Sequence, residues 1–327
     1  MLKALMIKPG ALNKAAMLAI LPLMVFAIMA TTRVTASTRL PLEDPREGTI
    51  VVANLRGASL TFQDLGGDGR SRTLILPAGP HELVTAGGRL YATLALADQL
   101  VEVDPDAPGV LRSLTLEGMP HGLALSGDEL LVTLDDANAL VTVDPESLTE
   151  LSRSTIGNTP HTVAVDSNGS VFVTASRENE LIQLPSGRSQ GTGALPESVG
   201  IAGQYAVTGN AASSSLSVFK REGLAFAGTI TLGGSPVRVI GIGETHVLVA
   251  LSDTAELAYV DLPSLTVERR IPVAERPDGL CLSPSGRFVG VVSNAKDAVT
   301  VLRTTDWRVQ ISLATGHGPG QCLWLAD

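Results

Sequence analysis

The sequence predicts an all-β protein, a seven-bladed β-propeller of four-stranded blades whose first and last strands share one blade. The first observation is that prolines recur at a nearly constant interval. Prolines recur at positions 80, 120, 160, 196, 236, 277 and 319, with spacings of 40, 40, 36, 40, 41 and 42 residues. The second is the content of each period, in which short apolar segments alternate with turns that contain Gly, Asp or Asn. Four strands in a repeat of about 40 residues are typical of a propeller.

The composition agrees with a β-sheet core. Hydrophobic residues make up 44% of the 327 residues, but aromatic residues only 3%. The core must therefore consist of Val, Leu, Ile and Ala, and β-branched side chains favour strands.

Residues 1–36 differ from the rest of the chain and are predicted to be a signal peptide. Lysines precede the apolar run Ala15–Ala30, and Val34 and Ala36 fit the small-residue cleavage pattern of a secretory signal. The run is short for a membrane span and contains Pro22. The alternative is an uncleaved N-terminal anchor. Both interpretations place the protein outside the cytoplasm, in the periplasm or the extracellular space.

The charge of the remaining chain excludes some partners. Residues 1–36 carry four positive charges and no acidic residue, so their removal changes the net charge from −9 to −13. Binding to nucleic acid or anionic lipid depends on Lys and Arg that neutralise phosphate. We therefore expect no nucleic-acid partner, and contact with a membrane only through an uncleaved N-terminal segment.

Residues 37–48 are predicted to be a linker, and residues 49–327 the propeller. The propeller begins with the strands Thr49–Asn54 and Ser59–Leu65, followed by a weaker strand over Arg72–Leu76.

In the later blades the second strand follows the first turn. We expect these second strands at Leu90–Leu94, Leu130–Leu134, Val171–Ala175, Tyr205–Gly209, Val247–Leu251 and Phe288–Val292. The third strands follow at Leu100–Asp104, Leu140–Asp144, Leu181–Leu184, Leu216–Phe219, Leu257–Asp261 and Val299–Leu302. Blade four departs from this pattern, because Pro196–Val199 is followed by Gly200 and then Gly203, which predicts a shortened first strand.

The two ends of the repeat region complete one blade. Pro319 is followed by residues for one strand, and the segment from Thr49 supplies a second, third and fourth strand without a first. Pairing of the two ends would close the ring of seven blades and cover two exposed sheet edges.

The second strands also carry a family resemblance. Tyr91–Leu94, Leu131–Leu134, Phe172–Ala175 and Val51–Asn54 resemble the YVTN repeat, as do the turn Ser283–Arg287 and the Val-Asp endings at 143–144 and 260–261. The resemblance covers Thr49 to the C-terminus and implies a propeller. Members of such families serve as surface proteins, as binding scaffolds and as parts of periplasmic oxidoreductases, so the resemblance selects no single function.

The most specific chemical signal is a set of histidines. His81, His121 and His161 directly follow the repeat proline in three consecutive blades, and His317 lies two residues before the last one. The positions equivalent to the three histidines in the other blades are Glu197, Val237, Asp278 and Gly320. The ligand-binding candidates are therefore His81, His121, His161, Glu197, Asp278 and His317, all expected at the mouth of the central channel.

Two interpretations of the histidines in these three consecutive blades stay open. Imidazole is a common ligand of Zn and Cu, which makes His81, His121 and His161 the metal candidates. A proline–histidine pair can also be a repeated structural element whose ring nitrogens bond to the backbone.

Acidic residues in the turns between second and third strands face the same rim. They are Asp98, Asp135, Asp136, Glu178, Asp253 and Asp297. Asp135 and Asp136, beside His121, could bind a metal or orient an imidazole. The simpler interpretation is that these acids are solvated turn formers.

The two cysteines, Cys281 and Cys322, lie on the first strands of blades six and seven. They could form a disulfide between adjacent blades in an exported protein, or remain buried free thiols. The sequence has no Cys-x-x-Cys pair, Gly-x-Ser-x-Gly elbow, His-Glu-x-x-His helix or phosphate-binding Gly-x-x-x-x-Gly-Lys motif.

These observations predict an exported binding or scaffold protein. Its loop face would bind a protein, peptide or small-molecule ligand. The alternative is a periplasmic metal-dependent enzyme, an oxidoreductase or lyase, that uses His81, His121 and His161 with help from His317 and Asp135.

Overall fold

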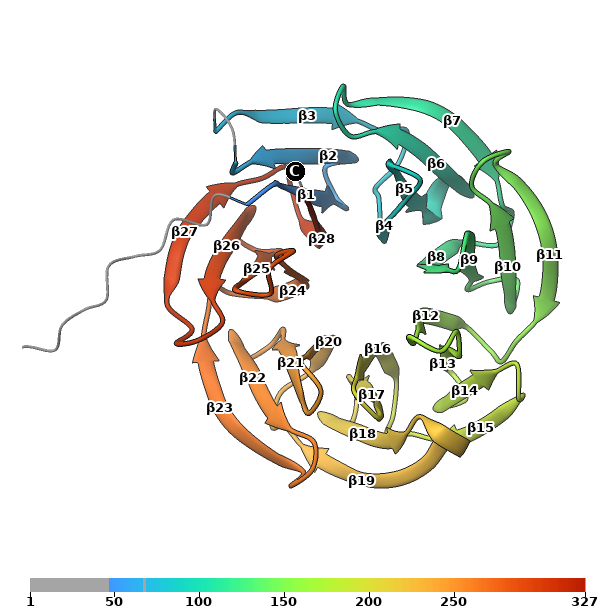
Figure 1. Ribbon diagram of the computed structural model, residues 1–327, viewed down its shortest axis with the longest axis vertical. Helices are drawn as coiled ribbons and strands as arrows, with labels where there is room; N and C mark the ends of the chain where they lie inside the picture. The colour runs from blue at the N-terminus through green and yellow to red at the C-terminus, as the bar shows by residue number, and fades with distance from the viewer. Residues whose placement is uncertain (1–46, 67–68, 327) are drawn as a thin grey trace, which may run out of the picture. The chain divides into compact units, whose positions relative to one another are not determined.

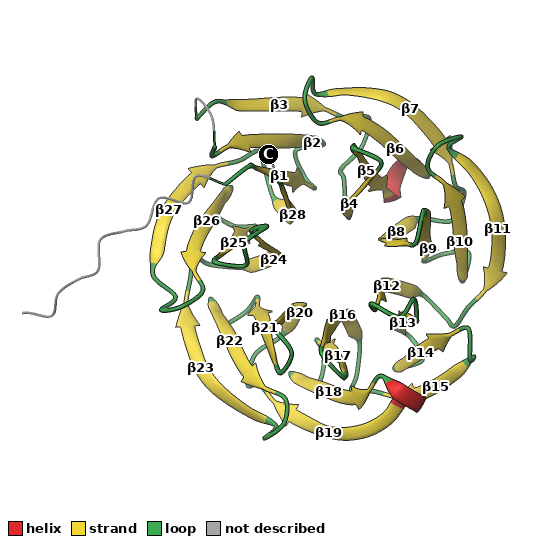
Figure 2. Ribbon diagram, in the orientation of Figure 1, coloured by secondary structure: helices red, strands yellow, loops and turns green. Residues whose placement is uncertain are grey.

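The computed structural model describes residues 47–66 and 69–326. This part of the chain forms twenty-eight strands in seven four-stranded antiparallel sheets, arranged as blades around a central axis (Figures 1 and 2). We number the blades by their repeat prolines, so that blade 1 follows Pro80 and blade 7 contains Pro319. The predicted seven-bladed propeller is confirmed. The predicted signal peptide lies outside the described residues.

Each blade has the same order of strands from the axis outward. The innermost strands are β4 (Leu83–Ala86), β8 (Pro120–Ser126), β12 (Pro160–Val165), β16 (Pro196–Ala202), β20 (Pro236–Ile242), β24 (Pro277–Leu282) and β28 (Pro319–Leu325). The second strands are β5 (Arg89–Leu94), β9 (Glu129–Leu134), β13 (Val171–Ala175), β17 (Tyr205–Asn210), β21 (His246–Leu251), β25 (Phe288–Ser293) and β1 (Thr49–Asn54).

The two outer layers complete the blades. The third strands are β6 (Gln99–Asp104), β10 (Ala139–Asp144), β14 (Glu180–Leu184), β18 (Ser215–Lys220), β22 (Glu256–Asp261), β26 (Ala298–Arg303) and β2 (Ser59–Asp64). The outer strands are β7 (Gly109–Thr115), β11 (Thr149–Thr155), β15 (Arg188–Gly191), β19 (Ala225–Thr231), β23 (Thr266–Pro272), β27 (Val309–Ala314) and β3 (Ser71–Ile75). Two short 3₁₀ helices, Ala95–Ala97 and Glu222–Leu224, lie in the loops.

The hydrophobic core lies between neighbouring blades. In blade 2, five of the six residues of β9 are buried, whereas every residue of β11 is exposed. One apolar cluster joins Tyr91 and Leu100 of blade 1 to Leu130 and Val132 of blade 2. Strands that are covered on both faces are continuous apolar runs, which explains why the second strands have the clearest sequence signal.

Blade 4 corrects one prediction from the sequence. Its first strand, β16, has seven residues, and Gly200 pairs within it with Val207. A Cβ atom on Gly200 would lie 2.8 Å from Val239 of the next blade, so this glycine permits close packing and does not end a strand. The short spacing belongs to blade 3, whose outer strand β15 has four residues.

The ends of the described chain close the ring. Strand β28 pairs antiparallel with β1, with Trp324 opposite Ile50. Cys281 of blade 6 and Cys322 of blade 7 form a disulfide with a Cα–Cα distance of 5.6 Å. Glu47, at the end of the predicted linker, contacts the same region, because its carbonyl oxygen accepts a hydrogen bond from the Trp324 indole. The two blades at the junction are therefore joined covalently and through the sheet.

No helix within residues 47–66 and 69–326 has the length and apolar character needed to cross a membrane.

The disulfide predicts a stability that depends on redox conditions. It joins residues 41 positions apart, and a loop of this length stabilises a fold by about 2–4 kcal/mol. We expect dithiothreitol to lower the free energy of unfolding by this amount in urea titrations. The Cys281→Ser/Cys322→Ser double variant should unfold at a lower urea concentration and should not respond to dithiothreitol. Equal midpoints for the reduced and oxidised protein would contradict a stabilising role.

Candidate functional site

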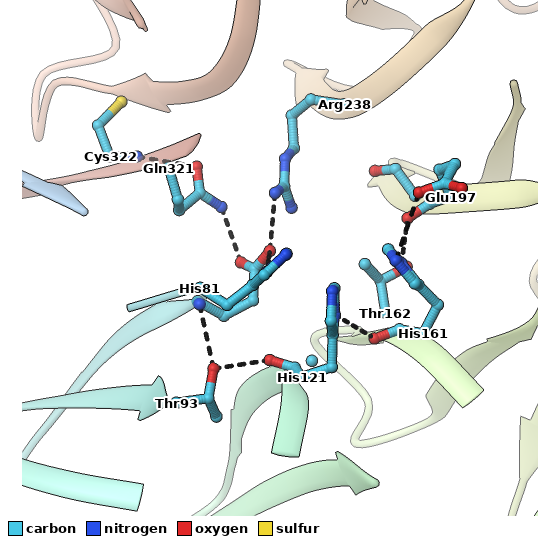
Figure 3. A network of polar contacts seen from close by, with 12 residues as sticks. His81, Thr93, His121, His161, Thr162, Glu197, Arg238, Gln321 and Cys322 are labelled. Carbon is cyan, nitrogen blue, oxygen red and sulfur yellow. Dashed lines mark hydrogen bonds and ion pairs between the residues drawn. The ribbon is translucent and has the colours of Figure 1, made fainter. Parts of the chain in front are cut away.

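Three histidines form a row at the central axis. His81, His121 and His161 occupy the position after the repeat proline in blades 1, 2 and 3 (Figure 3). The ring centroids of His81 and His121 are 3.5 Å apart, and those of His121 and His161 are 3.9 Å apart. The structure thus brings the three metal candidates into contact.

Threonines of the second strands hold the backbone of this row. The Thr93 hydroxyl accepts a hydrogen bond from the Glu82 amide and donates one to the His121 carbonyl oxygen of the next blade. Thr133 bonds in the same way to the Gly122 amide and the His161 carbonyl oxygen. The repeated threonine therefore connects adjacent blades at the height of the histidines.

Backbone carbonyls orient two of the rings. His121 Nδ1 lies 3.2 Å from the carbonyl oxygen of His161, and His161 Nδ1 lies 2.9 Å from that of Glu197. A carbonyl oxygen only accepts hydrogen bonds, so Nδ1 carries the proton and Nε2 keeps its lone pair. This tautomer leaves a lone pair on Nε2 of both rings for a metal ion, but Nε2 of His161 lies 3.3 Å from a Glu197 carboxylate oxygen, which would have to move or join the ligands.

Burial keeps these two rings neutral. Desolvation, together with His81 and His161, lowers the pKa of His121 well below its ordinary value. Desolvation, together with His81, lowers the pKa of His161 to about 4. A neutral imidazole is the form that binds metal.

Asp135 completes a set of potential ligands with His121 and His161. One ligand atom from each of these residues lies within 4.8 Å of the other two. The Asp135 side chain is only 8% exposed, and its Oδ1 has no hydrogen-bond partner. Burial, with the nearby charges of Asp136 and Glu197, raises the pKa of Asp135 to about 7.

The simpler interpretation of the rim acids is therefore wrong for Asp135. Its amide donates to the Met119 carbonyl oxygen, which holds the turn against the loop before His121 and buries the carboxyl group. The neighbouring Asp136 is exposed, as a turn former would be.

Other rim acids have a structural role. Their side chains accept hydrogen bonds from backbone amides in a loop just before a repeat proline, which is that of the next blade for Asp98 and Asp297 and that of the same blade for Glu178 and Asp253. These pairs are Asp98 with Met119, Glu178 with Asn158, Asp253 with Ser235, and Asp297 with Gly318. These acids thus shape four of the loops before repeat prolines, which agrees with the turn-forming interpretation.

His317 does not join the row. Its Nδ1 lies 3.2 Å from Asp297 Oδ2, and its side chain is 64% exposed. It lies in the exposed loop before Pro319 and does not line the cavity beside the row.

A buried ion pair crosses the axis beside the histidines. Arg238 of blade 5 donates to Glu82 of blade 1 at 2.7 Å, and Gln321 of blade 7 donates to the other carboxylate oxygen at 2.8 Å (Figure 3). Burial disfavours the charge of Glu82, but Arg238 and the hydrogen-bond donors outweigh it, so the pKa of Glu82 lies well below its ordinary value. The ion pair to Glu82 likewise outweighs burial and raises the pKa of Arg238.

Inspection of the sequence did not identify Glu82, Arg238 or Gln321. All three stand two residues after a repeat proline, next to the positions that we compared between blades. In blades 2 to 7, the pairing of the first two strands is irregular directly after the proline. This irregularity allows the second residue as well as the first to contribute to the site, so alignment of both positions would have found these residues.

A cavity of about 160 Å³ adjoins the row. Its lining residues are Leu55, Pro80, His81, His161, Glu197, Val237, Arg238, Asp278 and Gly320. Burial raises the pKa of Glu197, although His81 lowers it in part. Burial also raises the pKa of Asp278 to about 6, against the opposing effects of Arg238 and His81. Buried carboxyl groups with raised pKa values in a cavity are typical of functional sites.

Solved structures support the fold. A functionally unknown protein from Desulfotomaculum acetoxidans has a TM-score of 0.70 at 12% identity, over 86% of this chain and 99% of its own. The dihydro-heme d1 dehydrogenase NirN has a TM-score of 0.64 at 13% identity, over 87% and 76%. The virginiamycin B lyase of Staphylococcus aureus has a TM-score of 0.61 at 12% identity, over 72% and 84%.

No protein-family model and no curated protein matches the sequence. At these identities, the likeness to solved structures establishes the propeller fold and no particular activity.

The buried ion pair predicts an asymmetric response to mutation. Arg238→Met leaves the Glu82 carboxylate buried without its cation, which should lower the free energy of unfolding by about 3–5 kcal/mol. The double variant Glu82→Gln/Arg238→Met removes both charges and should recover much of this loss. Urea unfolding of both variants measures the difference.

The exposed pair Arg153–Glu150, at 2.9 Å, provides the control. Arg153→Met should cost less than about 1 kcal/mol, because exposed ion pairs contribute little. If Arg238→Met alone were as stable as the double variant, the proposed energetic role of the pair would be wrong.

The raised pKa of Asp278 predicts that its contribution to folding stability falls as the pH rises, whereas that of a salt-bridged acid would increase. A folded-state pKa of about 6, above the ordinary 3.8, makes Asp278 favourable to stability at low pH, and this contribution is lost as the pH rises through 6. Asp278→Asn should therefore raise the melting temperature relative to the original protein more at pH 8 than at pH 5. A difference that stays constant across this range would refute the prediction, and the exposed Asp253→Asn variant serves as control.

Proposed function

We propose that the protein is an exported binding protein whose loop face holds a transition-metal ion at His121, His161 and Asp135, with His81 beside them. The observation that carries the proposal is the buried set of two imidazoles and one carboxyl group. Both imidazoles have Nδ1 on a backbone carbonyl, and the Asp135 Oδ1 has no partner. Buried polar atoms in proteins are rarely left without a partner.

The donor set favours zinc or copper. Imidazole nitrogen with carboxylate oxygen and no sulfur suits Zn²⁺ or Cu²⁺. Three protein ligands would leave a coordination position for water or a ligand. Donor atoms around a tetrahedral zinc ion lie about 3.3 Å apart, so the present set, within 4.8 Å, would have to contract by at most about 1.5 Å.

The surroundings are also compatible with metal capture. His121 and His161 are neutral, so no proton has to leave these rings before an ion binds. Asp135 would lose its proton as the ion binds, which compensates part of the ionic charge. The segment 1–36 supports export, and a metal ion on the loop face could in turn bind a protein, peptide or small molecule.

A metal-dependent enzyme is the second candidate. The observation in its favour is the pKa of about 7 for Asp135, which suits a general base near neutral pH. The cavity beside the row could hold a small substrate next to this group. Two proteins of similar structure are a dehydrogenase and a lyase, so oxidoreductase and lyase chemistry are the classes to assay first.

Metal analysis tests the leading proposal. Protein purified without a histidine tag and dialysed against zinc or copper should retain about one ion per chain by mass spectrometry. His121→Ala and Asp135→Asn should each weaken binding by more than about tenfold in calorimetry, because even residues that only orient metal ligands contribute 10- to 100-fold.

His246→Ala is the matched control. His246 forms a second cluster with Asp261 and Glu268, which is more open to solvent than the set of His121, His161 and Asp135. This variant should keep the ion. Protein that binds neither metal, or affinity unchanged by His121→Ala, would reject the proposal.

A further inference from the structure

The cavity beside the histidine row is distinct from the potential metal ligands. It is lined by His161 of that set, but neither His121 nor Asp135 contributes to its wall. Its volume of about 160 Å³ equals that of about five water molecules in the liquid. A bare metal ion would fill only a small part of this space.

The charges in the cavity are not balanced. Arg238, the one Lys or Arg that lines the cavity, already forms an ion pair with Glu82 at 2.7 Å. Gln321 satisfies the second oxygen of Glu82, so both carboxylate oxygens are bonded, whereas the Nε–H of Arg238 has no partner in the described part of the chain. No Lys or Arg among the described residues pairs with the carboxyl groups of Glu197 and Asp278, on which His81 and Arg238 act only through their charges.

Asp278 has no partner at all within residues 47–66 and 69–326, neither a hydrogen bond nor an ion pair. Glu197 lies 3.3 Å from His161 Nε2, but the neutral His161 ring supplies no counter-charge. The two acids belong to blades 4 and 6, on either side of Arg238 in blade 5. Both acids are half-buried, and a carboxylate that is withdrawn from water without a partner costs free energy that a bound cation would offset.

The rest of the wall is apolar. Leu55, Pro80 and Val237 contribute hydrophobic surface, and Gly320 leaves space beside Asp278. An occupant that matches the whole cavity therefore has a positive head and a short hydrocarbon body. An ammonium group satisfies both requirements, because it donates up to three hydrogen bonds to carboxylates.

We propose that this cavity binds a small organic amine in its ammonium form, with the nitrogen on Asp278 and Glu197 and the carbon chain against Leu55 and Val237. The proposal does not depend on a bound metal ion. It can therefore fail while the metal site stands, and the metal site can fail while the amine site stands.

Calorimetry and ligand-observed NMR with n-propylammonium as the probe test this site. The protein is used without a tag, in EDTA at pH 7.5, so that metal binding does not contribute. Propylammonium should bind at one site, and propan-1-ol and propionate, which have similar shapes, should bind at least tenfold more weakly. Asp278→Asn should weaken propylammonium binding by about tenfold or more, because it removes a charge-assisted hydrogen bond.

Asp253→Asn controls for the change in net charge, because Asp253 is an exposed acid on the rim of the same face. It should bind propylammonium like the original protein. Asp278→Asn should fold, since it removes a buried charge, and circular dichroism checks this.

Three outcomes would overturn the proposal: propylammonium binding that Asp278→Asn leaves unchanged, equal binding of propan-1-ol, or no binding of propylammonium. Uptake of a second zinc ion that is lost in Asp278→Asn, without amine binding, would assign the cavity to a metal instead.

Discussion

The pairing of β28 with β1 is the constraint on which the rest of the structure depends. The seventh blade takes β28 from one end of the propeller and β1 to β3 from the other. Without this pairing, β28 and β1 would each present an unpaired edge, and the apolar faces of blades 1 and 6 would lose a neighbour. Closure also fixes the number of blades, and with it the separation of residues that face the axis. Gln321 shows this directly, because it lies on the closing strand and holds Glu82 of the next blade.

Within each repeat, the residues that shape the loops differ from those whose side chains form the site. The threonine of the second strand and the acid of the following turn bond to backbone atoms, so they shape each loop whatever side chains the loop carries. The two residues after the proline take no part in that bonding through their side chains. They can therefore vary from histidine in three blades to Arg238 or Asp278 in others without a change of fold, which is why the fold alone indicates so little about function.

The sequence was sufficient to predict the architecture but only part of the site. A period of about 40 residues and continuous apolar second strands located blades and strands to within one or two residues. The interpretation of Gly200 as the end of a strand is wrong because a glycine in an apolar segment can mark either a strand end or close packing against another blade. Asp135 was misinterpreted because burial depends on the path of a turn. The pair of Glu82 and Arg238 was missed because 156 positions separate two charges that meet only across a closed ring.

The polar groups at the axis divide into satisfied and unsatisfied ones. Six buried side-chain atoms have no partner in the described part of the chain, and three of them, on His81, Asp135 and Arg238, lie at this mouth. Folding alone would favour their removal, because a buried polar atom without a partner costs free energy. At the position of His81, blades 5 and 7 hold Val237 and Gly320, and at the position of Arg238, blades 2 and 6 hold Gly122 and Gly279, so the fold accepts apolar residues at both positions. The metal ion proposed above would give Asp135 its missing partner, so the free energy that folding loses at this atom would be recovered on binding.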